Sequence, residues 1–152
     1  MNEGEQAPAM AVEASDGRRF PLRDRGGRPL LLYFYPKDDT SGCTRQAQDF
    51  TALAADFAAA GVDVLGVSRD DAASHGGFIA KHGLGIPLAT DDGRLSGAFG
   101  TWVEKSMYGR KYMGMERATF LIDGAGRVAR AWRRVKVPGH AAEVLAAARG
   151  LG

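Results

Sequence analysis

The chain has 152 residues, of which 45% are hydrophobic and 25% charged, a composition typical of one ordinary domain with a substantial core. We therefore expect a single domain over residues 1–152. Twenty basic and eighteen acidic residues leave a formal charge of +2, too small an excess to indicate binding to nucleic acid. No apolar leader is present and no run reaches the roughly 18 apolar residues of a membrane span. We expect a cytoplasmic protein that does not bind membranes.

The first strongly apolar segment, residues 29–35, is short, continuous and stopped by Pro36. This pattern predicts a strand buried on both faces in the centre of a sheet. After Cys43, apolar residues recur at three- and four-residue steps until Gly61, which predicts one amphipathic helix. A second buried strand is expected over residues 62–68. The order strand, helix, strand predicts a parallel pair joined by a right-handed crossover.

The second half of the chain continues the alternation of helices and strands. We expect a helix to about His82, capped by Asp70 or Asp71 and ended by Gly83, then an extended piece at 85–89 and a brief helix around 95–99. A loop is expected over 100–115, followed by a hairpin of strands 117–123 and 127–135 and by a closing helix at 141–149, with Pro138 as its first residue. This order predicts an α/β protein with a central mixed β-sheet flanked by α-helices, which is the thioredoxin-like fold.

Cys43 is the only cysteine, and it lies where the first strand gives way to the first helix. A helix N-terminus offers unpaired N–H groups and a partial positive charge, which favour thiolate over thiol. A lone cysteine is more often a buried structural residue, but the charged and small residues before Cys43 favour a reactive one. A helix end contributes only about 0.3–1 kcal/mol. A second cation is therefore required, and a guanidinium about 4 Å away would contribute on the order of 4 kcal/mol.

The residues before Cys43 leave alternatives open. Thr40 could cap the helix or turn its hydroxyl toward the sulfur, because both tasks use the same three-residue spacing. Pro36 either shapes the loop and keeps solvent off the sulfur or only ends the strand. Lys37, Asp38 and Asp39 are interpreted as residues that keep the loop in solvent.

The three histidines, at positions 75, 82 and 140, fall on predicted helices without a second ligand at metal spacing. We interpret them as surface residues. The sequence therefore indicates neither a metal site nor a cofactor.

The spacing Pro36-x-x-x-Thr40-x-x-Cys43 resembles the peroxiredoxin active-site pattern. Residues 33–44, YFYPKDDTSGCT, are similar to the bacterioferritin comigratory protein (PrxQ) subfamily, and the similarity covers nearly the whole chain, with its clearest further matches at 65–70, 83–88, 102–114 and 117–123. The resemblance implies a thiol-dependent peroxidase. Cys43 would be the peroxidatic thiolate, which attacks hydrogen peroxide or an alkyl hydroperoxide and becomes a sulfenic acid.

The same resemblance implies roles for the residues around the thiol. Thr40 would hold the peroxide oxygens, Pro36 would shield the sulfur, and Arg117 would supply the missing guanidinium. Backbone N–H groups near Gly42 and Cys43 would add further donors. Without the resemblance, Arg117 reads as a surface charge at the start of a strand.

Two positions depart from the family pattern. Gln48 stands where many relatives carry a resolving cysteine, and Ser41 stands where proline is common. The sulfenic acid of Cys43 must then be reduced by an external thiol, such as thioredoxin, glutaredoxin or glutathione, or through a disulfide with a second copy of the chain. We expect a monomer or a weak homodimer.

Two other functions are compatible with the sequence. Oxidised Cys43 could form a mixed disulfide with a target protein, with little turnover, which would make the protein a thiol redox sensor. The cysteine could also be merely buried in a thioredoxin-fold protein without redox activity.

Overall fold

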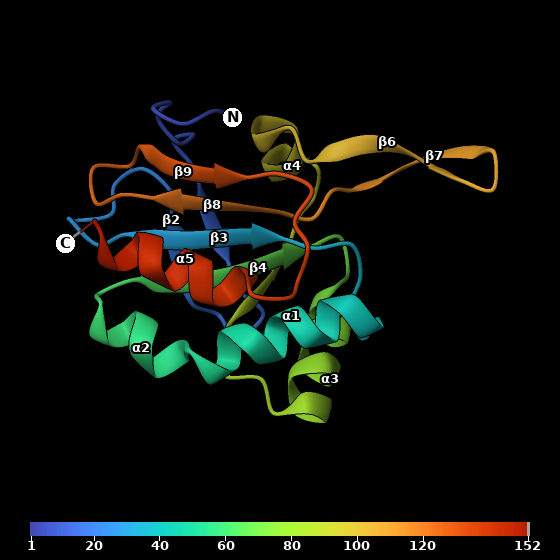
Figure 1. Cartoon of the computed structure of the whole chain (residues 1–152), viewed down its shortest axis with the longest axis horizontal. Coiled ribbons are helices and arrows are strands. Elements are labelled where there is room, and N and C mark those ends of the chain that lie inside the picture. Colours follow the sequence, from blue (N-terminus) through green and yellow to red (C-terminus); the bar gives the residue numbers. More distant parts are fainter. Residues whose placement is uncertain (152) are drawn as a thin grey trace.

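The computed structural model describes residues 1–151, and its centre is a five-stranded sheet in the order β5-β4-β3-β8-β9 (Figure 1). The strands are β3 Leu30–Phe34, β4 Asp63–Ser68, β5 Leu88–Thr90, β8 Ala118–Ile122 and β9 Val128–Trp132. β3 pairs in parallel with β4 and antiparallel with β8. The prediction of a central mixed sheet is therefore confirmed.

Helices and a small second sheet cover this central sheet. The helices are α1 Ser41–Ala52, α2 Ala54–Ala59, α3 Ala72–His82, α4 Arg94–Phe99 and α5 His140–Arg149. The small antiparallel sheet consists of β1 Ala11–Glu13 and β2 Arg19–Pro21, which the sequence analysis did not identify.

Successive side chains of β3 point to opposite faces of the sheet, which divides the core into two layers. Leu31 and Tyr33 pack in one cluster with side chains from α1, α2, α3 and α5. Leu30, Leu32 and Phe34 pack in the other with side chains from α4, β1 and β2. Figure 1 shows α1, α2 and α5 together on one side of the sheet. The flanking helices of a thioredoxin-like fold are thus in place.

The long helix predicted after Cys43 is interrupted. α1 ends at Ala52 and α2 starts at Ala54, because Leu53 between them has φ −101° and ψ 5°, outside the helical region. Leu53 still packs against the core cluster. The apolar spacing is continuous across this residue, so the pattern predicted one helix where the backbone forms two.

The prediction of a loop over residues 100–115 is wrong. This segment forms a β-hairpin of β6 Trp102–Met107 and β7 Arg110–Met115. The hairpin projects from the body of the protein (Figure 1) and pairs with no other strand in the described chain. Most of its side chains are therefore exposed on both faces. The alternation of apolar and polar residues by which a half-buried strand is recognised is absent.

The boundaries of α3 agree with the sequence analysis. Asp71 is the N-cap and accepts a hydrogen bond from Ser74 N at 2.8 Å, and Gly83 ends the helix with φ 59°. α5 differs slightly: its N-cap is Gly139 with φ 77°, so Pro138 precedes the helix rather than starting it. None of the helices in residues 1–151 is long and apolar enough to cross a membrane.

Candidate active site

Cys43 is the third residue of α1, directly after the loop that follows β3. β3 and β4 are parallel, so this loop lies at the edge of the sheet where their carboxyl ends meet and where open α/β sheets generally bind ligands. Only 2% of Cys43 is exposed, and it packs in the same cluster as Tyr33 and Tyr35. A thiol at this position lies beside the free N–H groups of the first helical turn.

Arg117 connects β7 to β8, and its guanidinium lies at the thiol. Nη2 donates to Cys43 Sγ at 3.4 Å, and Nη1 donates to Gln46 Oε1 at 2.6 Å. The structure thus brings a cation to the sulfur, as the charge argument required, and the cation is the arginine that the family resemblance indicated.

Gln46 was missed in the sequence analysis. It is 1% exposed and lies three residues after Cys43, on the same face of α1. That spacing from the only cysteine was the signal that could have identified it. Because Gln46 accepts from Nη1 while Nη2 points at the sulfur, it holds the guanidinium in one orientation.

Gly42 leaves room for this guanidinium. A Cβ added at Gly42 would lie 3.1 Å from Nη2 of Arg117, closer than an ordinary van der Waals contact. The glycine therefore has a steric task besides presenting its backbone N–H.

Thr40 and Pro36 lie on the loop before α1. Thr40 is the N-cap residue by position, with extended backbone, but its side chain does not cap the helix. The hydroxyl instead donates to Lys37 O at 2.9 Å, so the structure shows neither of the two orientations considered from the sequence. Pro36 is half-buried, immediately after Tyr35.

Asp38 and His75 form a buried polar cluster beside the loop. Asp38 is 7% exposed, accepts from Tyr35 Oη at 2.5 Å and from Ser74 Oγ at 2.8 Å, and lies 2.8 Å from His75 Nδ1. Burial would raise the pKa of Asp38, but the hydrogen bonds from His75, Tyr35 and Ser74 outweigh burial and lower it. The interpretation of Asp38 as a solvent-facing residue is wrong, because this carboxylate joins the loop to α3.

Asp39 makes a second connection to α3. Its backbone is in the left-handed region, with φ 58°, which is uncommon for a residue other than glycine. Its carboxylate accepts from Lys81 Nζ at 2.6 Å and lies 2.7 Å from His82 Nε2. These hydrogen bonds lower the pKa of Asp39. Two consecutive carboxylates therefore hold the loop against α3, a few residues before Cys43.

The surface assignment of the histidines is wrong for two of the three. His75 is fully buried and His140 is 5% exposed, with Nε2 of His140 2.8 Å from Thr119 Oγ1. Burial lowers the pKa of His140. Both rings pack under neighbouring elements that helical spacing alone does not reveal. Among residues 1–151, no three His, Cys, Asp or Glu side chains are grouped so that they could hold a metal ion.

Comparisons with known proteins show which family the chain belongs to. Residues 4–131 match the AhpC/TSA family. Peroxiredoxin Bcp of Xanthomonas campestris is 49% identical over 139 residues, covering 91% of this chain and 87% of the relative. Peroxiredoxin Bcp of Bacillus subtilis is 44% identical over 143 residues, covering 93% and 91%. A solved structure of the Xanthomonas campestris bacterioferritin comigratory protein superposes with a TM-score of 0.89 at 45% identity, covering 98% of each chain.

The chain is a thioredoxin-fold protein that carries its cysteine at a helix N-terminus. Within this class of proteins it belongs to the AhpC/TSA family, among the Bcp/PrxQ peroxiredoxins. It is accordingly a thiol-dependent peroxidase. Solved structures of the Xanthomonas campestris peroxiredoxin Q include cysteine-to-serine mutants at two different positions, so that relative has at least two cysteines. This chain has one, and it has no second thiol with which to resolve the oxidised form.

Proposed function

We propose that the protein reduces hydrogen peroxide and alkyl hydroperoxides through Cys43 alone and is returned to the thiol by an external thiol reductant. The observation that carries the proposal is the 3.4 Å approach of Arg117 Nη2 to the sulfur of the only cysteine. The related Xanthomonas campestris protein has been studied structurally for its alkyl peroxide reduction activity, which supports alkyl hydroperoxides as a substrate class.

In the first step, the thiolate of Cys43 attacks the terminal oxygen of the peroxide. A sulfur–oxygen bond forms, the oxygen–oxygen bond breaks, and the departing alkoxide or hydroxide takes up a proton as alcohol or water. The sulfur is oxidised to the sulfenic acid and the peroxide is reduced. An external thiol then attacks the sulfenic sulfur, water leaves, and a second thiol releases Cys43 from the mixed disulfide.

The residues around the sulfur would act on the charge that moves during the first step. Arg117 would stabilise the thiolate and then the negative charge on the leaving oxygen, together with the backbone N–H groups of Gly42 and Cys43. The hydroxyl proton of Thr40 is committed to the Lys37 carbonyl. Its oxygen would therefore accept a hydrogen bond from the peroxide. Pro36 would limit the access of water from the loop side.

The test is peroxide consumption by the purified protein. Hydrogen peroxide and an alkyl hydroperoxide are each supplied with dithiothreitol, with thioredoxin, its reductase and NADPH, or with glutaredoxin and glutathione. Sustained consumption with at least one reductant is expected, together with its complete loss in Cys43→Ser. A cytoplasmic location stays a prediction, and so does a monomeric or weakly dimeric state.

A second candidate is a thiol redox sensor, which the lack of a second cysteine favours. A sensor would consume one equivalent of peroxide and stop with Cys43 in a mixed disulfide. Mass spectrometry after one equivalent of peroxide distinguishes this outcome from repeated turnover.

A further inference from the structure

The hairpin of β6 and β7 carries large hydrophobic side chains that are exposed to solvent. The large hydrophobic side chains that are exposed in residues 1–151 all belong to it: Met107 is 56% exposed, Tyr108 99%, Tyr112 43% and Met113 52%. The strand register places Met107 and Tyr112 on one face of the hairpin and Met113 on the other. Exposed apolar side chains on one element are typical of a protein interaction site. A hollow of about 630 Å³ lies at the same place, lined by Met107, Tyr108, Arg110, Lys111 and Tyr112.

The turn at the tip of the hairpin exposes its side chain to solvent and does not pack it against the protein. Tyr108 and Gly109 both have positive φ, 51° and 77°, as in the two-residue turns that suit a twisted hairpin. Asparagine, aspartate and glycine are the usual residues at the first of these positions. A tyrosine there is conformationally costly, and at 99% exposure it gains almost no contact within the chain. A partner that covers the ring would offset this cost.

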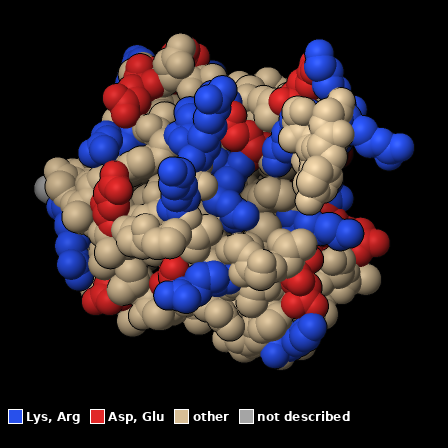
Figure 2. All heavy atoms as spheres, turned by 45° about the vertical axis from the view of Figure 1, so that its right-hand side comes forward, with Lys and Arg blue, Asp and Glu red and all other residues tan. Residues whose placement is uncertain are grey.

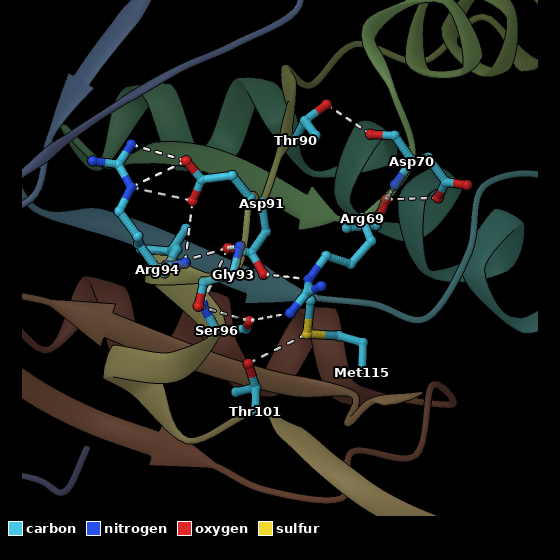
Figure 3. A network of polar contacts seen from close by, with 12 residues as sticks. Arg69, Asp70, Thr90, Asp91, Gly93, Arg94, Ser96, Thr101 and Met115 are labelled. Atoms are coloured by element: carbon cyan, nitrogen blue, oxygen red, sulfur yellow. Dashed lines mark hydrogen bonds and ion pairs between the residues drawn. The ribbon is translucent and has the colours of Figure 1, made fainter. Parts of the chain in front are cut away.

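The root of the hairpin is fixed to the body of the protein. The guanidinium of Arg69 lies 3.8 Å from the ring centroid of Trp102, the first residue of β6, and Arg69 Nε donates to Asp91 at 2.8 Å. Figure 3 shows Arg69 reaching Asp91 and Ser96, and Thr101 donating to the sulfur of Met115, the last residue of β7, at 3.3 Å. Both strands are thus held where they leave the body, and the hairpin has a defined direction.

The hairpin is also connected to the peroxidatic thiol. β7 ends at Met115, two residues before Arg117, whose guanidinium lies against Cys43. Lys105 of β6 extends along the hairpin, since a Cβ at Gly114 would lie 3.2 Å from its Cδ. Burial lowers the pKa of Lys105, and the positive charge of Arg117 lowers it further while the Cys43 thiolate opposes this. Lys105 of the hairpin therefore lies close enough to Arg117 and Cys43 for their charges to act on it.

Basic side chains also lie on the face beside the hairpin. Figure 2 shows Lys and Arg side chains over the middle of this face, with Asp and Glu side chains between them. On the hairpin, Arg110 and Lys111 line the hollow beside the exposed apolar side chains. A partner that fits this surface is apolar at its centre and acidic at its edge.

We infer that the β6–β7 hairpin is the docking surface for the protein dithiol that reduces Cys43, and this inference rests on the function proposed above. Every turnover of a peroxidase with one cysteine requires a thiol from outside, and Cys43 is only 2% exposed. The partner's thiolate must reach the sulfenic sulfur, displace water and form a mixed disulfide, which the partner's second thiol then breaks. An adjacent surface that holds the partner raises the local concentration of that thiol.

Three variants test the surface, and thioredoxin with its reductase and NADPH serves as the probe. Tyr108→Asn removes the ring and keeps a residue that tolerates positive φ. Met113→Gln replaces an exposed apolar side chain, and Arg110→Glu reverses a charge. Arg19→Glu makes the same charge reversal at an exposed position of β2 and is the matched control.

We expect the thioredoxin-dependent kcat/KM to fall about tenfold in Tyr108→Asn and in Arg110→Glu, as for a central interface residue. The fall in Met113→Gln should be smaller. The rate with dithiothreitol should stay at the wild-type value in every hairpin variant, and the thermal unfolding temperature should not fall. The kinetics of Arg19→Glu should stay at wild-type values with both reductants. Rising salt should weaken the thioredoxin reaction in the wild type more than in Arg110→Glu.

Three outcomes would overturn the inference while leaving the proposed function in place. The first is unchanged thioredoxin kinetics in every hairpin variant, and the second is a wild-type protein that turns over with dithiothreitol but not with thioredoxin or glutaredoxin. The third is a dimer in sedimentation that Tyr108→Asn converts to a monomer. The last would mean that the hairpin joins two copies of the chain. A wild-type protein that consumes no peroxide even with dithiothreitol would instead remove the proposed function.

Discussion

Nη2 of Arg117 lies 3.4 Å from Sγ of Cys43, although 74 residues separate them in the chain. The two meet because the chain segment leading into β8 and the helix following β3 reach the same edge of the sheet, where β3 and β8 are antiparallel neighbours. Gln46 on α1 orients the guanidinium through Nη1, and Gly42 leaves the space it occupies. One turn of α1 therefore supplies the thiol, the residue that orients the cation and the room for it.

Replacing Arg117 should slow the reaction with peroxide. Arg117→Ala removes the cation from the sulfur and the leaving oxygen, and we expect the rate of Cys43 oxidation to fall by about 10²–10³, as when one oxyanion donor is lost. Arg117→Lys should recover part of the rate, because lysine keeps the charge but cannot bond Gln46 and the sulfur through a planar fork. Stopped-flow oxidation measures the rate, and thiolate absorbance against pH measures the ionised fraction.

The matched control for Arg117 is Arg45→Ala. Arg45 lies on the same helix, but its side chain is 72% exposed and pairs with Asp49. This variant should react at the wild-type rate. Wild-type kinetics in Arg117→Ala would remove Arg117 from the mechanism.

Gly42→Ala should lower the peroxidase activity without lowering the stability of the fold. The added methyl group would lie 3.1 Å from Nη2 of Arg117 and should displace the guanidinium from the sulfur. Alanine favours a helix over glycine by about 0.5–1 kcal/mol, so the free energy of unfolding should not fall much. We expect slower peroxide reduction at nearly unchanged stability. Gly76→Ala, at a helical position with open space around it, is the control and should keep full activity.

Asp38 should make stability depend on pH in the acid range. Since the pKa of Asp38 is lowered in the folded state, its contribution is fully present above the ordinary carboxyl pKa of about 4 and is lost as the pH falls through the lower, folded value. Asp38→Asn should therefore reduce the free energy of unfolding at pH 7 by about 1–3 kcal/mol. The difference from the wild type should narrow below about pH 4.

Chemical denaturation across this pH range measures the effect of Asp38. Asp24→Asn is the control, because Asp24 is exposed and its carboxylate makes no hydrogen bond or ion pair within residues 1–151. A difference between Asp38→Asn and the wild type that stays constant down to the acid transition would contradict the role of the Asp38 cluster.

Gln48→Cys should restore an internal disulfide only if α1 unwinds. Five residues along a helix correspond to a rise of about 7.5 Å, beyond the Cα separation that a disulfide spans without backbone movement. After one equivalent of peroxide, we expect mass spectrometry to find an intramolecular disulfide, and hydrogen exchange to find reduced protection in α1. Ala58→Cys, exposed on α2, should form no such bond. A disulfide formed with α1 still protected would contradict this prediction.

The fold was largely predictable because its main signals are local. The continuous apolar run of β3 and the glycine after α3 each reflect burial or backbone geometry of the segment itself. The β6–β7 hairpin was missed because a strand exposed on both faces has no periodic apolar pattern. β1 and β2 are only three residues each, too short for a periodic pattern to be recognised.

The sequence by itself determined the thiol on which the proposed reaction depends, because the chain has a single cysteine, within a Pro-Thr-Cys spacing after a buried strand. The tertiary structure decided its surroundings: the orientation of Arg117 by Gln46, the burial of His75 against Asp38, and the direction of the Thr40 hydroxyl toward Lys37. Each of these depends on which segments the sheet brings together or on how one loop closes. Local periodicity records how each segment is buried, but not which distant polar group it meets.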